Sequence, residues 1–439
     1  MGGSIPLREL PEKSIALRTP RGYDVWHVSE MHGVTEITVH VLLFISLYFE
    51  VLLLIAFFEK FSTVARMPVA RDADLPSVTI VVPCHNEERT VSDTIESLLR
   101  LDYPHEKLSL VVVDDGSTDN TLDVARRFES ERVRIHSKEN GGKYSALNLA
   151  IERSESEFIG CLDADSFVHP SALRRIIPYF ADPRVMAVTP AITVHNPRTA
   201  LQLVQRAEYM LSVFIRRAFS FLGSIFITPG PFSIFRTQVF RELGGFRDAH
   251  HTEDLELGLR LQEKRYRIEN AHDAYVYTVG PATLGALIRQ RVRWTYGFLK
   301  NAFDYRHMFF NPRYGTLGMI VLPIVTLSVF TGLYFAGLLI TRIVSTVADK
   351  VNQVQLTSLA ASAPAVDWFF LNTGSYMFII ATLVLLTVSL IMIGRNLVNE
   401  PRLWSRDLPL YILLYGFIAP LWLARAVMNA AFSRKESWK

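Results

Sequence analysis

The chain has 439 residues, 49% of them hydrophobic and 20% charged, so it is long enough for one globular domain and several membrane spans. The formal net charge of +3 gives no strong overall field for nucleic acid, and we expect no nucleic-acid partner. The two cysteines, Cys84 and Cys161, lie far apart, which argues against a disulfide framework and a zinc site. This cysteine usage fits a reducing, cytoplasmic setting.

The first 34 residues form a polar arm without a short apolar core and cleavage site, so we expect no cleavable signal peptide. An apolar segment at 35–58 has the length that a bilayer needs, about 20 residues, and contains Glu50. An ionisable residue in a span usually faces a cavity or a protein neighbour, where Glu50 would line a polar path. The alternative is that Glu50 lies near the membrane interface.

Residues 75–310 alternate short apolar strands with helical segments, which predicts one α/β domain with a parallel sheet. The predicted strands at 78–82, 110–113 and 158–162 end beside polar or acidic residues. Ligands bind beyond the carboxyl ends of the strands in such sheets. We therefore expect the acids at these strand ends to converge on one crevice.

Two segments, 200–222 and 284–305, combine apolar residues with arginine along a predicted helix. A basic amphipathic helix commonly lies at a membrane surface. The alternative is that both segments are core helices of the globular domain. We favour the interfacial interpretation because apolar spans follow soon after the second segment.

Three further apolar segments are candidate membrane spans: 316–341, 376–394 and 408–428. If the middle domain is cytoplasmic, the basic loop 395–407 should be cytoplasmic too, which agrees with its arginines. Four spans, however, would place the basic tail 429–439 outside. Either the last segment does not fully cross the membrane, or the positive-inside rule fails for this tail. Arg425 within that segment favours the first explanation.

Asp163 and Asp165 follow a predicted strand as Asp-Ala-Asp. Two carboxylates at this spacing can hold a hard divalent cation, Mg²⁺ or Mn²⁺, whose octahedral shell is completed by diphosphate oxygens. Taken alone the pattern is weak, because a solvated loop or a helix cap explains it as well.

Asp114 and Asp115 also follow a predicted strand, where an acid can accept hydrogen bonds from a base or ribose and can equally stabilise a tight turn. The segment Gly141-Gly142-Lys143 precedes a predicted helix. Its glycines let the backbone approach an anion, and Lys143 supplies a positive charge for phosphate. The segment lacks the spacing of a P-loop, so nucleotide hydrolysis is not supported.

Thr252-Glu253-Asp254 begins a predicted helix, with Thr252 as its expected cap. Helix capping alone explains the threonine and a first-turn acid. Asp254, with Glu253 beside it, is nevertheless our candidate catalytic base, because an acceptor hydroxyl must lose its proton as a glycosidic bond forms. Attack through the acceptor opposite a departing diphosphate would invert the anomeric centre.

Gln290, Arg293 and Trp294 lie at i, i+3 and i+4 and therefore share one helical face. Arg293 can bind a diphosphate, Gln290 can hydrogen-bond to it, and Trp294 offers an aromatic face to a sugar ring. An interfacial helix that anchors in lipid headgroups would show the same pattern.

Together these motifs resemble those of the family 2 membrane glycosyltransferases, in the order Asp114-Asp115, Asp163-Ala164-Asp165, Thr252-Glu253-Asp254 and Gln290-Arg291-Val292-Arg293-Trp294. This family includes cellulose, hyaluronan, chitin-oligosaccharide and poly-N-acetylglucosamine synthases. The resemblance covers about residues 78–306 and the flanking spans. It implies a GT-A type nucleotide-sugar-binding domain inserted between transmembrane helices.

The resemblance also implies roles for individual residues. Donor-binding residues would be Pro83, Glu87, Asp114, Asp115, Lys143, Asp163, Gln290, Arg293 and Trp294. The metal would be held by Asp165 and Asp163, and the acceptor by Gly230, Pro231 and Trp294. Asp254 would be the base, next to Glu253.

By this resemblance we expect an inverting enzyme of the inner or plasma membrane with a cytoplasmic catalytic domain. It would transfer sugar from a UDP-sugar, UDP-N-acetylglucosamine or UDP-glucose, to the growing end of a polysaccharide and extrude the polymer. The alternatives are a single-transfer enzyme that acts on a membrane lipid, and an inactive transporter or scaffold. The expected partners are the donor, a polysaccharide or lipid acceptor and the bilayer, with room for an accessory membrane subunit. One span before the domain, instead of two, departs from several relatives.

Overall fold

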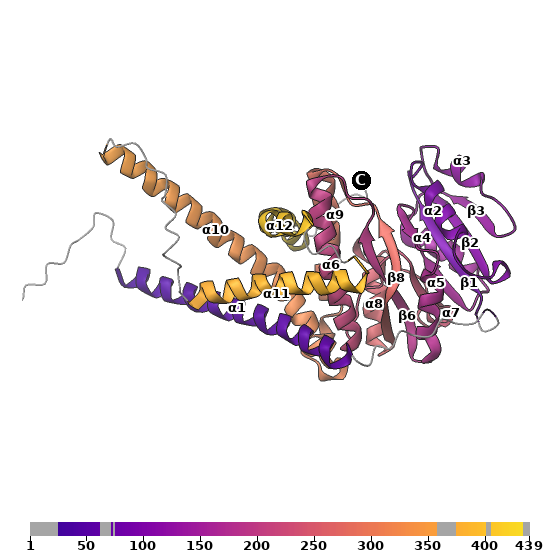
Figure 1. Cartoon of the computed structure of the whole chain (residues 1–439), viewed down its shortest axis with the longest axis horizontal. Coiled ribbons are helices and arrows are strands. Elements are labelled where there is room, and N and C mark those ends of the chain that lie inside the picture. The colour runs from indigo at the N-terminus through magenta and orange to yellow at the C-terminus, as the bar shows by residue number, and fades with distance from the viewer. Residues whose placement is uncertain (1–24, 62–71, 73–74, 358–374, 401–404, 433–439) are drawn as a thin grey trace, which may run out of the picture.

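The structure, a computed structural model, describes residues 25–61, 72, 75–357, 375–400 and 405–432. An α/β domain lies at one end of the molecule, and long helices project from its other side (Figure 1). Most of the polar arm and the basic tail beyond residue 432 lie outside the described residues.

An eight-stranded sheet forms the centre of the domain, in the order β3-β2-β1-β4-β7-β6-β8-β5. The strands are β1 (Val78–Cys84), β2 (Leu108–Asp115), β3 (Val133–Lys138), β4 (Phe158–Cys161), β5 (Ser166–Val168), β6 (Val185–Val194), β7 (Ser233–Arg236) and β8 (Arg267–Thr278). The four strands from β3 to β4 run parallel, as predicted.

The expectation of a parallel sheet holds for the predicted strands, but beyond β4 the sheet is mixed. Strand β7 is antiparallel to both of its neighbours, and β5 is antiparallel to β8. The chain enters β7 at the edge where β4 ends, since the Phe232 N–H donates to the Cys161 carbonyl at 2.7 Å. The chain therefore begins β7 beside the carboxyl end of β4. A strand that begins there and pairs with β4 must run antiparallel to it.

Apolar residues fill both faces of the sheet. Because side chains alternate along a strand, Ile80 packs on one face and its neighbour Val81 on the other. The helices of the domain are α2 (Val91–Leu99), α3 (Thr121–Arg126), α4 (Lys143–Glu152), α5 (Ala172–Ile176), α7 (Thr237–Leu243) and α8 (Glu253–Glu263). Strands β1 and β2 are buried along almost their full length, as strands covered on both faces are.

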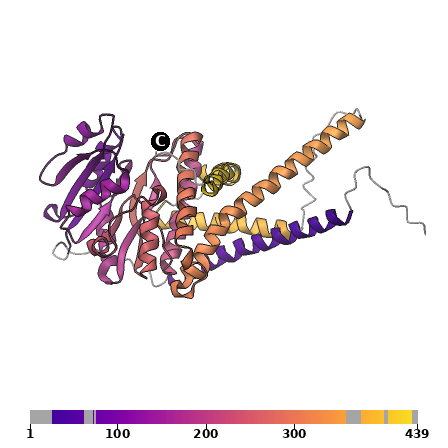
Figure 2. The same cartoon turned by 180° about the vertical axis from the view of Figure 1, so that it is seen from behind.

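Two longer helices, α6 (Ala200–Phe221) and α9 (Leu284–Asp304), coincide with the two predicted amphipathic segments. They lie between the sheet and the apolar helices (Figures 1 and 2). A capping box at Thr199 begins α6, and the Thr283 hydroxyl caps α9. Both helices bury apolar residues such as Phe214 and Val292 against the rest of the protein, so the interfacial and the core interpretations both stay open.

Four helices in the described part of the chain are long and apolar enough to cross a membrane: Thr35–Lys60, Leu317–Gln355, Met377–Leu397 and Asp407–Ala431. They lie in α1 (Val25–Phe61), in α10 (Leu322–Thr357) with the π-helical turn η7 (Leu317–Val321), in α11 (Ser375–Leu397) and in α12 (Asp407–Ala431). The second is longer than the predicted segment 316–341, because its polar end continues as helix.

The apolar helices differ in direction. Helices α1 and α11 run side by side away from the domain, whereas α12 is seen end-on beside α9 (Figure 1). The Thr387 hydroxyl of α11 donates to Glu50 of α1 at 2.8 Å, so Glu50 faces a protein neighbour. The loop after α11 contacts the domain, since Glu400 pairs with Arg206 and Asn399 donates to the Tyr275 hydroxyl at 2.7 Å.

Candidate active site

The candidate site lies at the carboxyl ends of the parallel strands. Asp115 is the last residue of β2, and Asp163 follows the end of β4. Lys143 is the first residue of α4 and Glu253 the first residue of α8. The strand-end crevice expected from the sequence is therefore the place where the motif residues from distant segments meet.

Lys143 is the centre of this group. Its Nζ lies 2.6 Å from Asp163 Oδ1 and 3.1 Å from Glu253 Oε1. Burial alone would lower the pKa of Lys143, but the carboxylates of Asp163 and Glu253 outweigh burial and raise that pKa well above its usual value. Lys143 is therefore a fixed cation that holds two of the three acidic motifs together.

Gly230 closes one side of the cluster. A Cβ at this position would lie 2.5 Å from Asp163 Oδ1 and 2.6 Å from Lys143 Nζ. A larger residue here would displace the Asp163 carboxylate or the Lys143 ammonium from its present place. The next residue, Pro231, leads through Phe232, which has a φ of +63°, into β7. The stretch predicted to bind the acceptor thus borders the acidic cluster.

Asp254 lies beside the same cluster. Burial and the neighbouring Glu253 carboxylate raise the pKa of Asp254 to about 6, against the opposite effect of Lys143. Its Oδ1 accepts from the Leu255 N–H at 2.9 Å, and its backbone carbonyl accepts from the Thr228 hydroxyl at 2.7 Å. A half-buried carboxylate with such a pKa can exchange a proton near neutral pH, as a general base must.

Asp165 and Glu87 add further negative charge. Burial, Asp163 and Glu87 raise the pKa of Asp165 to about 7. Burial and Asp163 likewise raise the pKa of Glu87, although its bond from the Thr90 hydroxyl at 2.7 Å lowers it. Among the residues that the structure describes, no three His, Cys, Asp or Glu side chains gather as a ready-made metal site.

This donor set fits a hard divalent cation. Mg²⁺ and Mn²⁺ sites commonly use one or two carboxylates and take the remaining oxygens from water and substrate phosphates. Asp163 and Asp165 supply two such carboxylates, and their crowding makes a cation favourable.

The first acidic pair has a structural role as well. Asp115 accepts from Lys138 Nζ at 2.8 Å and from the N–H groups of Gly141 and Gly142 at 3.0 and 2.8 Å. Asp114 accepts from the Ser117 N–H at 3.3 Å. Both acids are almost fully buried, so the Asp115 carboxylate fixes the glycine loop that presents Lys143. Pro83 lies within β1, beside this pair, and Glu87 lies in the following turn.

Thr252 occupies the N-cap position of α8, as expected, but the expected capping bond of its side chain is not made. Its side chain makes no capping bond to α8; the hydroxyl donates to the Ala249 carbonyl at 3.1 Å and accepts from Asn301 Nδ2 at 2.9 Å. The turn before Thr252 points the hydroxyl back toward α9. A Cβ on Gly297 would lie 2.3 Å from this hydroxyl oxygen, so α9 packs directly on the acidic segment.

Gln290, Arg293 and Trp294 lie on one stripe of helix α9. The same stripe continues to Gly297, which lies four residues after Arg293 and three after Trp294. Trp294 is 36% exposed, and the Arg291 guanidinium lies 4.5 Å from its ring centroid. Arg291 pairs with Glu208 of α6 at 2.8 Å. One face of the Trp294 ring is thus covered by protein. Gln290 Oε1 is buried and makes no hydrogen bond within the described chain.

Two residues that shape the site, Glu208 and Asn301, were not expected from the sequence. A buried asparagine seven residues after Trp294 on the same helical stripe is the signal that could have identified Asn301. Glu208 carries no such signal, because its partner Arg291 is distant in sequence.

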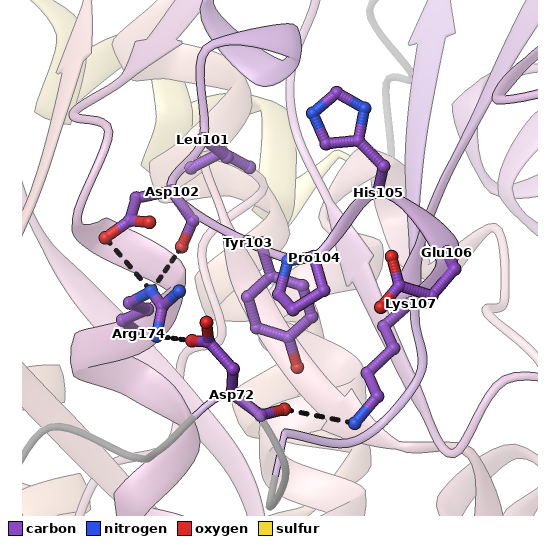
Figure 3. Close-up of a pocket in the computed structure, with 9 residues that line it drawn as sticks. All are labelled: Asp72, Leu101, Asp102, Tyr103, Pro104, His105, Glu106, Lys107 and Arg174. Carbon is purple, nitrogen blue, oxygen red and sulfur yellow. Dashed lines mark hydrogen bonds and ion pairs between the residues drawn. The ribbon is translucent and has the colours of Figure 1, made fainter.

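A separate pocket of about 610 Å³ opens at the other end of the strands (Figure 3). It is lined by Asp72, Leu101, Asp102, Tyr103, Pro104, His105, Glu106, Lys107 and Arg174. Arg174 pairs with Asp72 at 2.6 Å and with Asp102 at 3.0 Å. These charges join residue 72, ahead of β1, to the domain, and none of the predicted site residues lies here.

Comparison with known proteins agrees with this geometry. Residues 76–297 match the family described as glycosyltransferase like family 2. A poly-β-1,6-N-acetyl-D-glucosamine synthase of Staphylococcus aureus is 32% identical over 228 residues, 51% of this chain and 55% of the relative. The synthase of the same name from Staphylococcus epidermidis is 30% identical over 261 residues, 58% of this chain and 63% of the relative. The aligned region thus spans less than two thirds of either relative.

The fold has a counterpart among solved structures. A mannosyltransferase of Pyrobaculum calidifontis, solved in complex with GDP-Man and Mn²⁺, superposes with a TM-score of 0.57. The match covers 90% of this chain and 99% of the other at 21% identity, which shows a shared GT-A type fold.

Proposed function

This chain belongs to glycosyltransferase family 2, and from that premise we propose that it is a processive, inverting polysaccharide synthase. The proposed donor is UDP-N-acetylglucosamine or UDP-glucose; the similar synthases of two staphylococci are named for a polymer of N-acetylglucosamine, which favours the first. One observation carries the proposal: Lys143 joins Asp163 to Glu253, with Asp254 beside them, at the carboxyl ends of the strands.

In the proposed reaction, Asp254 takes the proton from the acceptor hydroxyl. The hydroxyl oxygen bonds to the anomeric carbon as the bond from that carbon to the diphosphate oxygen breaks, and the nucleoside diphosphate leaves with the bonding electrons. Attack from the side opposite the leaving group inverts the configuration. The pKa of about 6 leaves Asp254 mostly ionised near neutral pH, as this role requires.

The remaining residues would hold the two substrates. Lys143 and Arg293 would bind the diphosphate of the nucleotide sugar. The amide oxygen of Gln290, which is buried and unbonded, would accept a hydrogen bond from the nucleotide sugar. The exposed face of Trp294 would stack on the acceptor sugar, and Gly230 and Pro231 would also contact the acceptor. Pro83, Glu87, Asp114 and Asp115 would surround the nucleoside, with Asp115 acting through the glycine loop.

We further propose that Asp163 and Asp165 bind Mg²⁺ or Mn²⁺ together with the donor. When bound, the cation would neutralise charge that develops on the leaving diphosphate. Support comes from the crowded carboxylates around Asp165, whose mutual repulsion a cation relieves.

For the membrane, we propose three crossings, α1, α10 and α11, with the catalytic domain on the cytoplasmic side and the polymer extruded between the helices. Helix α12 would lie along the membrane surface instead of crossing. From Leu408 to Ala426 it packs on α6, α9 and α11, and Trp422 of α12 shares one apolar cluster with Leu287 and Val292 of α9. This arrangement would keep the basic tail on the cytoplasmic side, where its charges favour it.

The function is tested with purified protein, radiolabelled UDP-sugars and Mg²⁺ or Mn²⁺. Label in polymer that resists organic extraction supports the proposal. Label only in the lipid phase would show a single-transfer enzyme with a lipid acceptor, and no transfer with any sugar would show an inactive scaffold. Asp254→Asn should retain donor binding and lose transfer, and transfer near the wild-type rate would remove Asp254 as the base.

The topology is tested separately with a reporter fused after residue 439. We expect cytoplasmic reporter activity. A reporter active outside the cell would show that α12 crosses.

A further inference from the structure

The segment before the proposed base has an uncommon backbone. Ala249, His250 and His251 have φ values of +35°, +56° and +65°. Residues other than glycine rarely adopt this left-handed region, and three in succession must be held there by surrounding contacts. Thr252 and the start of α8 follow immediately, so the conformation of this turn determines the positions of Glu253 and Asp254.

Helix α9 supplies these contacts. The side-chain amide of Asn301 donates to the Ala249 carbonyl at 3.1 Å and to the Thr252 hydroxyl oxygen at 2.9 Å. It also lies 2.9 Å from the carbonyl of Gly297, one turn earlier. Asn301 is only 1% exposed, so water cannot replace these bonds. Loss of the amide would remove the side-chain bonds by which α9 holds the turn, and the Ala249 carbonyl would keep only its bonds from the N–H and hydroxyl of Thr252.

Two neighbouring contacts act on the same turn. At the next turn of α9, Asp304 Oδ2 lies 2.9 Å from His250 Nε2. One turn before Asn301, the absence of a side chain on Gly297 lets Thr252 approach the helix backbone. The left-handed turn is therefore held from three successive turns of one helix, with Asn301 at the centre.

The same helix carries the proposed diphosphate clamp. Arg293 and Trp294 lie eight and seven residues before Asn301 and share its stripe, because seven residues complete about two helical turns. A rigid helix thus connects the residues proposed to hold the donor and acceptor with the turn that carries the proposed base.

We propose that Asn301 is a positioning residue for sugar transfer: by holding the left-handed turn 249–251 it fixes Asp254 relative to Arg293 and Trp294. This inference rests on the proposed role of Asp254 as the base. It concerns geometry alone, since Asn301 need not touch either substrate. An asparagine suits the position because its amide nitrogen donates to oxygen atoms of both the turn and α9, and an ionised aspartate would have no hydrogen to donate.

The test compares Asn301→Ala with the intact full-length chain. Misplacement of a catalytic group by about 1 Å can cost about 100-fold in rate, so we expect kcat to fall by about 10- to 100-fold. The KM for the donor and the affinity for UDP should change by less than about twofold, because these depend on groups outside the turn. Asn311→Ala, an asparagine beyond the end of α9, is the matched control and should retain kcat.

A second substitution separates positioning from packing. Glycine adopts a positive φ without steric cost, so Ala249→Gly relaxes the turn. If Asn301 acts by holding the turn, Ala249→Gly combined with Asn301→Ala should recover at least about fivefold of the lost kcat. If Asn301 only fills space in the core, the glycine would recover nothing.

The outcomes are distinct. Unchanged kcat in Asn301→Ala, lost affinity for UDP, or a loss of kcat that Ala249→Gly does not recover would each overturn the inference. If Asp254→Asn retains transfer, the proposed base itself is wrong, whatever Asn301 does. If Asp254→Asn is inactive and Asn301→Ala is fully active, only the positioning role fails.

Discussion

The acid side of the pH profile should report on Asp254. The pKa of Asp254 is raised from 3.8 to about 6, first by burial and then by the Glu253 carboxylate. At about 1.4 kcal/mol for each pKa unit, the surroundings disfavour the Asp254 carboxylate by about 3 kcal/mol. A base must be deprotonated to act, so the transfer rate should rise with pH through about 6.

Glu253→Gln removes the repulsion between the two carboxylates and leaves the burial of Asp254 unchanged. Because burial is the larger cause, the substitution should lower the pKa of Asp254 by about 0.5 to 1, less than half of the total increase. The acid limb should move toward lower pH by the same amount. At about pH 5, the rate should rise from about a tenth of its plateau to between a quarter and a half. The plateau itself should fall, because Glu253 also pairs with Lys143.

The assay is nucleoside diphosphate release with acceptor and saturating Mn²⁺, measured from about pH 4.5 to 8.5, with each profile scaled to its own plateau. Asp123→Asn, an exposed carboxylate on α3, is the control and should leave the midpoint in place. A midpoint that stays near the wild-type value or moves upward in Glu253→Gln would refute the electrostatic reasoning.

Three further substitutions test other parts of the molecule. Gly230→Ala should reduce transfer by at least about 100-fold, because the new Cβ would lie 2.5 Å from Asp163 Oδ1. Gly337→Ala is the control and should be neutral, because its Cβ meets open space. Equal transfer rates for the two variants would contradict this prediction. Trp294→Ala should shorten the polymer seen by gel sizing, and an unchanged length distribution would remove Trp294 from acceptor binding. Asp407→Ala should cost about 3 to 5 kcal/mol, because it removes the carboxylate that pairs with the buried Arg395 guanidinium, and an unchanged melting temperature in detergent would contradict that cost.

The sequence predicted the parts of the site that depend on local pattern. Asp163 follows a run of buried strand residues, and Lys143 follows two glycines, so their places at the ends of β4 and at the start of α4 could be expected. The shared stripe of Gln290, Arg293 and Trp294 also follows from helical spacing alone. These features need no knowledge of distant partners.

Features that depend on contacts between distant segments were not predictable in this way. The sequence predicts that the Thr252 side chain caps the helix. A left-handed turn without glycine precedes Thr252, however, and the residue types at 249–251 do not predict that backbone. The antiparallel direction of β7 depends on where its chain returns to the sheet. The pairing of Glu208 with Arg291 joins residues 83 positions apart.

The apolar core of the catalytic domain is not confined to that domain. One continuous cluster joins Phe57 of α1 and Leu390 of α11 to Phe235 of the central sheet, and it includes Val321 at the start of the second apolar helix. During synthesis, residues 75–310 leave the ribosome before α10 to α12 exist. The catalytic domain therefore completes its core only when the later helices arrive, so its maturation is coupled to membrane insertion and its excised form would expose part of its own interior.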